Sequence, residues 1–66
     1  MKKITDRQAQ YLLRLINQTY GTSYRYLSQV REDGIGQRMN KVVGISMQEA
    51  SSLIDRYTAL AKRRGN

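Results

Sequence analysis

The stretch Ile4-Thr5-Asp6-Arg7-Gln8-Ala9 returns, with substitutions, 41 positions later as Ile45-Ser46-Met47-Gln48-Glu49-Ala50. Each copy has the order expected of a helix N-terminus: an apolar residue, a hydroxyl residue, and a Gln or Glu three positions further on. In such a capping box the hydroxyl accepts a hydrogen bond from the amide of the Gln or Glu, whose side chain accepts one from the amide of the cap residue. The sequence therefore predicts two helices, capped by Thr5 and Ser46.

Apolar residues follow each cap with helical spacing, so each predicted helix has one apolar stripe. In the first helix the stripe consists of Ala9, Leu12, Leu13, Ile16 and Tyr20. In the second it consists of Ala50, Leu53, Ile54, Tyr57, Leu60 and Ala61. We therefore predict two amphipathic helices, over about residues 6–20 and 47–63, the first ended by Gly21.

The connector between the two helices has a weaker pattern. A shorter helix is predicted over about residues 24–31, because Tyr24, Leu27 and Val30 or Arg31 have helical spacing and Asp33-Gly34 marks a turn after them. Residues 37–43 are predicted as a short helix or helical turn, with an extended segment as the alternative. The whole prediction is an all-α fold in a single domain, residues 1–66: a compact bundle of three to four short helices.

The residue types exclude several classes of function. The chain has no cysteine and no histidine, which removes the usual metal ligands and the usual nucleophile and general base. The acidic residues show no metal-binding spacing, and Asp6 and Glu49 are explained by the favourable field at a helix N-terminus. We therefore predict a protein that is not an enzyme, with no catalytic residue, no metal and no cofactor.

Length and hydropathy give further expectations. No apolar run is long enough to span a bilayer, and the basic start of the chain is followed by polar residues rather than by the apolar segment of a signal peptide. We therefore expect a cytoplasmic protein with no membrane partner. With 66 residues the core is small, so a homodimer that extends it is an alternative to a monomer.

The net charge is +7, from 12 Lys and Arg against 5 Asp and Glu. A field of this size favours an anionic partner, either nucleic acid or an acidic protein surface. We expect the contacts in the middle of the chain and at its C-terminus, where cations cluster on or beside flexible segments. The predicted binding residues are Arg38, Lys41, Lys62, Arg63 and Arg64, with Arg56 as a weaker member.

Two other groups of polar residues have competing interpretations. Arg25 and Tyr26 could stack on bases or neutralise phosphates, but Arg25 could equally be a solvated residue of the connector. Arg7 and Arg14 lie on the outer face of the first helix, where we expect a weaker local field than at the clustered cations. Arg38 and Lys41 are expected to be as exposed as this helix-one pair.

The residues of the two long helices resemble a small module found in proteins of phages, conjugative elements and some bacterial chromosomes. Its first helix has the form T-x-K/R-Q-x-x-Y/F-L-x-x-L, matched from Thr5 to Leu15. Its second has the form L-S/T-x-x-E-A-S-x-x-I, matched from Ser46 to Ile54 with Ile45 in place of the leading Leu. The resemblance does not extend to the connector. It implies a compact helical module from a mobile genetic element, some of whose relatives accompany recombination and replication proteins, and it carries no catalytic residues.

These observations predict a small basic protein that binds nucleic acid, DNA in preference to RNA, mainly through phosphates and with limited sequence specificity. The alternative is a phage-type inhibitor or adaptor that docks on the acidic surface of a host protein that processes nucleic acid, defence proteins included. The same exposed cations would serve either purpose.

Overall fold

The structure is a computed structural model that describes residues 2–64, the side chain of Arg64 excepted. Two long helices, α1 (Asp6–Tyr20) and α3 (Met47–Arg64), are joined by a connector. The connector contains two 3-10 turns, η1 (Leu27–Gln29) and η2 (Glu32–Gly34), and the short helix α2 (Ile35–Met39). No β-strand occurs within residues 2–64, so the predicted all-α class is confirmed.

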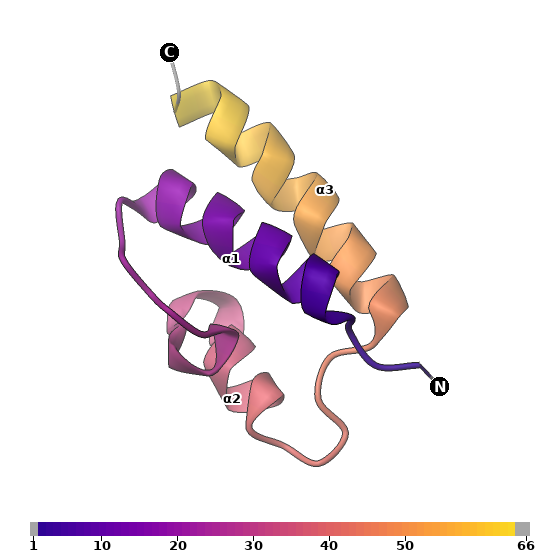
Figure 1. Cartoon of the computed structure of the whole chain (residues 1–66). Helices are drawn as coiled ribbons and strands as arrows, with labels where there is room; N and C mark the ends of the chain where they lie inside the picture. Colours follow the sequence, from indigo (N-terminus) through magenta and orange to yellow (C-terminus); the bar gives the residue numbers. More distant parts are fainter. Residues whose placement is uncertain (1, 65–66) are drawn as a thin grey trace.

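The two long helices lie side by side and begin at the same end of the molecule, so they run parallel (Figure 1). Backbone bonds tie their N-termini together: the Ile4 amide donates to the Ile45 carbonyl at 2.8 Å, and the Met47 amide to the Lys2 carbonyl at 2.9 Å. The Gln8 side chain also donates to the Met47 carbonyl, at 3.2 Å. The repeated stretch of sequence thus forms two neighbouring caps.

Both predicted N-caps are confirmed. Thr5 has the complete capping box, in which its Oγ1 accepts from the Gln8 amide at 3.0 Å and its own amide donates to Gln8 Oε1 at 3.1 Å. Ser46 Oγ accepts from the Glu49 amide at 3.1 Å. The Glu49 carboxylate forms an ion pair with Arg38 of α2, a long-range partner that the capping pattern did not predict.

We expect Thr5→Ala and Ser46→Ala each to lower the free energy of unfolding by about 0.5–2 kcal/mol, because each leaves a helix amide without its acceptor. Thermal melts followed by circular dichroism would measure the loss. An exposed serine inside α3, Ser52, provides the control, since Ser52→Ala removes a hydroxyl without removing a cap. Melts of both cap variants that overlay the wild type would contradict the assignment.

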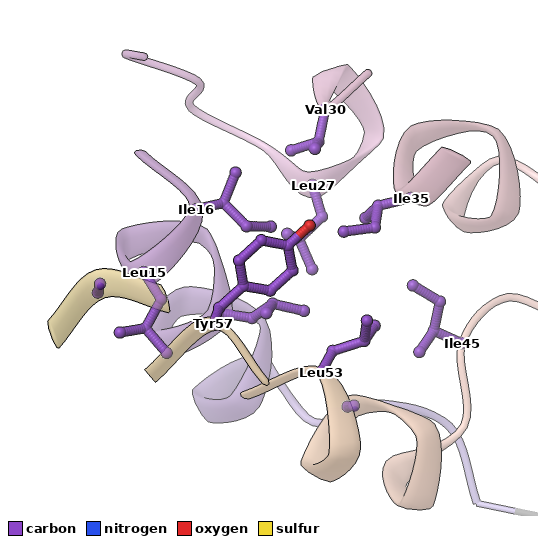
Figure 2. Packing of buried hydrophobic residues seen from close by; sticks show 11 residues of the cluster. Leu15, Ile16, Leu27, Val30, Ile35, Ile45, Leu53 and Tyr57 are labelled. Atoms are coloured by element: carbon purple, nitrogen blue, oxygen red, sulfur yellow. The ribbon is translucent and has the colours of Figure 1, made fainter. Parts of the chain in front are cut away.

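The core lies between the helix pair and the connector (Figure 2). Tyr57 of α3 is completely buried at its centre, and its hydroxyl points toward the connector, which contributes Leu27, Val30 and Ile35. The predicted stripes supply most of the rest, chiefly Leu12, Ile16, Ala50 and Leu53, and two residues outside the stripes, Leu15 and Ile45, are buried with them. Tyr20, predicted on the stripe, instead lies at the edge of the core, 37% exposed.

The helix predicted over residues 24–31 is wrong, and Asn17 of α1 explains why. Its Oδ1 accepts from the Tyr24 amide at 2.9 Å, and its Nδ2 donates to the Tyr24 carbonyl at 2.9 Å. Gln29 Oε1 then accepts from the amides of Arg25 and Tyr26. Because side chains satisfy these backbone groups, the chain needs no helical turn there, and only the 3-10 turn η1 forms.

The second part of the connector is helical earlier than predicted. The α2 helix begins at Ile35 and ends at Met39, and residues 40–44 form a turn in which Gly44 has a φ of 66°. The turn places Val42 and Val43 in solvent, 90% and 69% exposed. At the start of α2 the buried Gly36 lies against η1, and its amide donates to the Val30 carbonyl at 2.8 Å.

Candidate functional site

Two of the predicted binding residues form ion pairs within the fold. Arg38 pairs with Glu49, which joins α2 to the first turn of α3, and its side chain is only 37% exposed. The Arg38 Nε is buried without a hydrogen-bond partner within residues 2–64. Arg56 approaches Asp33, with 3.7 Å between Nη1 and Oδ2. Arg38 is therefore less exposed than expected, and both guanidinium groups already have a carboxylate beside them.

Asp33 belongs to a polar group that fastens the connector to α3. The Tyr57 hydroxyl donates to the Asp33 carboxylate, and the Tyr20 hydroxyl lies 3.4 Å from that of Tyr57. The Tyr20 ring meets the Tyr57 ring edge-on, with centroids 5.9 Å apart. Burial, together with the bond to Asp33, raises the pKa of Tyr57 far above its usual range. These groups stabilise the fold, and their contacts do not require a ligand.

The other predicted cations are exposed but do not form one cluster. Lys41 lies in the turn after α2, close in sequence to the N-terminus of α3, whereas Lys62 and Arg63 lie on the last turns of that helix. The intervening helix is about 20 Å long at 1.5 Å per residue. The side chain of Arg64 lies outside the described residues. The structure thus separates the middle cations from the C-terminal ones.

A different surface gathers cations and aromatic rings around α1. Arg7, Tyr11 and Arg14 are spaced by four and three residues, so they lie on one side of the helix, and all three are exposed. Together with Ile54 of α3 they line a shallow groove of about 480 Å³. Tyr11 is 48% exposed, so much of its ring is open to solvent.

A second groove, of about 460 Å³, adjoins the first. Arg25 and Tyr26 of the connector line it, with Leu13 of α1 and Met39 of α2, and Tyr26 is 65% exposed. Gln10 lines both grooves, which are therefore neighbours across α1. We call this combined area the α1 surface, and define it by six residues: Arg7, Gln10, Tyr11, Arg14, Arg25 and Tyr26.

The α1 surface includes two of the predicted residues, Arg25 and Tyr26, and adds residues that sequence reasoning placed second or passed over. Tyr11 was recognised only as lying off the apolar stripe. The i, i+4, i+7 spacing of Arg7, Tyr11 and Arg14 could have indicated an aromatic ring flanked by two arginines. The spacing could not have indicated that this group lies near Arg25 and Tyr26, because that depends on the path of the connector.

No family model, curated protein or solved structure matches this chain. None of the helices within residues 2–64 has the length and apolar character needed to cross a bilayer. The same part of the chain has no group of three or more acidic, His or Cys side chains placed to hold a metal ion.

Proposed function

We propose that this protein binds nucleic acid, DNA in preference to RNA, through phosphate contacts and with limited sequence specificity. One observation carries the proposal: most of the cations are exposed and form no ion pair within residues 2–64. These residues are Lys2, Lys3, Arg7, Arg14, Arg25, Arg31, Lys41, Lys62 and Arg63. Such unneutralised charge is what releases counterions from a phosphate backbone.

The acidic side chains reinforce this imbalance, because several are used inside the fold. Glu49 and Asp33 are paired with arginines, and Glu32 accepts a hydrogen bond from the Tyr24 hydroxyl at 3.0 Å. The positive surface is therefore not compensated by neighbouring carboxylates of comparable number. In this proposal the protein is not an enzyme, needs no cofactor, acts in the cytoplasm and originates from a mobile genetic element.

Binding should depend strongly on salt. We expect micromolar affinity for oligonucleotides at low salt, with a log–log slope of about −0.9 per neutralised phosphate on a duplex and about −0.7 on a single strand. Fluorescence anisotropy over a series of salt concentrations would measure both. Matched oligonucleotides of unrelated sequence serve as the control, since phosphate contacts give similar affinities. Absence of binding to either form at low salt would refute the proposal.

The second candidate is a protein-binding function: an inhibitor or adaptor that docks on an acidic surface of a host protein that processes nucleic acid. The turn after α2 favours it, because Val42 and Val43 are exposed beside Lys41. The side chains of two exposed valines cannot hydrogen-bond to a phosphate, whereas a protein interface would bury them. Loss of nucleic-acid binding in the experiment above would turn attention to this candidate.

A further inference from the structure

We propose that the α1 surface binds a single strand of nucleic acid, with bases stacked on Tyr11 and Tyr26 and phosphates held by Arg7, Arg14 and Arg25. This inference rests on the proposed function and names the form of nucleic acid and the place where it binds. It differs from the expectation drawn from the sequence, which placed the contacts in the middle of the chain and at the C-terminus.

Positive charge and an aromatic ring alternate along one side of α1. Arg7 and Arg14 lie about two helical turns apart, or about 10 Å along the axis, with Tyr11 between them. A strand that follows this side of α1 can place a base against the tyrosine while its flanking phosphates meet the arginines. Proteins that bind single strands without sequence preference combine these two features, a cationic groove and stacking rings.

Both tyrosines lie on hydrogen-bonded backbone, and their rings stay accessible. Tyr11 is on a regular helix, and Ile54 of α3 lines the same groove. Tyr26 is on the connector, where Gln29 Oε1 accepts from its amide at 3.2 Å. Neither ring belongs to the buried core, so neither is needed there for packing. A ring on an ordered backbone loses less conformational freedom when a base stacks on it than a ring on a disordered segment does.

Charge and hydrogen bonding across the two grooves also favour an anionic strand. Among the residues that line the grooves Asp6 is the one carboxylate; it lines the second groove only, in the first turn of α1, where the helix dipole favours a negative charge. Three arginines outweigh it. Gln10, which lines both grooves, can donate to a base or a phosphate as the strand crosses α1. The surface thus has contacts along its full width.

The predicted form is a single strand because the aromatic faces require unstacked bases. In a duplex each base is covered above and below by its neighbours, so a tyrosine in a groove cannot reach a base face. A single strand exposes that face for every base, which also makes the contact tolerant of sequence. A positively charged surface alone would not make this distinction, since it attracts both forms.

The test compares double variants in anisotropy titrations with oligo-dT of about 12 nucleotides and a hairpin duplex of matched length. The first is Tyr11→Ala with Tyr26→Ala, the second Arg7→Gln with Arg14→Gln. The third, Lys62→Gln with Arg63→Gln, is the control, because it removes the same charge from exposed positions outside the surface. Far-ultraviolet circular dichroism checks that each variant keeps its helices.

We expect wild type to bind the single strand more tightly than the hairpin, and the double tyrosine variant to lose about tenfold or more of that affinity. Tyr11→Phe with Tyr26→Phe should restore it, since phenylalanine keeps the stacking face. The Arg7 and Arg14 variant should lower the salt slope on the single strand by about 1.4 and weaken binding more than the control does.

The inference can be overturned in two distinguishable ways. If wild type binds with the expected salt dependence but the tyrosine variant binds the single strand as tightly, the location is wrong and the proposed function stands. Tighter binding to the hairpin, unaffected by the tyrosine variant, has the same meaning. If wild type binds neither oligonucleotide, the inference and the proposed function fail together.

Discussion

Gly36→Ala is expected to lower the free energy of unfolding by about 3 kcal/mol or more, a large part of the total of about 3–10 kcal/mol for a domain of this size. A Cβ at this position would lie 2.7 Å from the Ser28 carbonyl oxygen and closer still to that of Val30. Both obstacles are backbone atoms, one in η1 and one in the residue that follows it, so neither can move aside as a side chain would. The clash exceeds the gain of up to about 1 kcal/mol that alanine brings to a helix.

Urea denaturation followed by circular dichroism would measure this loss. Gly21→Ala is the matched control, because the added Cβ meets nothing within 4 Å and the strain comes only from the φ of 66°. That substitution should cost about 1–2 kcal/mol. If the Gly36 variant is no less stable than the Gly21 variant, then α2 does not pack against η1 as closely as described.

Tyr57→Phe is expected to lower the free energy of unfolding by about 1.5–3 kcal/mol, because it removes a hydrogen bond to a carboxylate. The ring that fills the core remains, so the loss reports the hydroxyl alone. Tyr24→Phe is the control: it removes a similar bond, to Glu32, from a tyrosine that is only partly buried. It should cost less. Equal losses would show that burial adds nothing to the Tyr57 bond.

The same variant should alter the stability at alkaline pH. The pKa of Tyr57 is raised in the folded state by burial and by its bond to Asp33, so the folded protein holds this proton more tightly than the unfolded chain. The resulting stability is complete below about pH 10, the ordinary tyrosine pKa, and is lost as the pH rises above it. The difference between wild type and Tyr57→Phe should therefore shrink above pH 10, by up to about 1.4 kcal/mol per pH unit.

The sequence sufficed for features that depend on neighbours along a helix. The caps at Thr5 and Ser46 were predictable because the donor and acceptor lie three residues apart. The apolar stripes were predictable because helical spacing places their residues on one face. Two exceptions are Tyr20, which lies at the exposed end of α1 in a T-shaped contact with Tyr57, and Leu15, which is buried although it was not predicted on the stripe.

The conformation of the connector was harder to predict, because it depends on residues in other elements of the fold. Asn17 holds Tyr24 from seven positions earlier, and no local pattern indicates that an amide on a polar helix face will bind the loop that follows. The partners of Arg38 and Arg56 were hidden for the same reason, since Glu49 and Asp33 approach them only in the folded chain.

The candidate site shows the same division. Exposure of Arg25 and Tyr26 could be expected from a polar connector. Their position beside α1 could not be expected, because it requires the 3-10 turn η1 to fold back toward Leu13, which lines the same groove. Tyr11 has a readable spacing relative to Arg7 and Arg14, yet only the groove between α1 and α3 shows that its ring stays uncovered.

The parallel course of α1 and α3 has a consequence for how the chain folds. In an antiparallel hairpin the two helix ends that meet are joined by a short loop. Here residues 2–4 must come into contact with residues 45–47, far along the chain, before the two caps can pair. The entropic cost of closing a loop rises with the number of residues in the loop, and contacts between distant parts of a chain slow folding. Although every element is local and helical, we therefore expect the slow step of folding to be the encounter of the two repeated stretches, as is usual for sheet proteins.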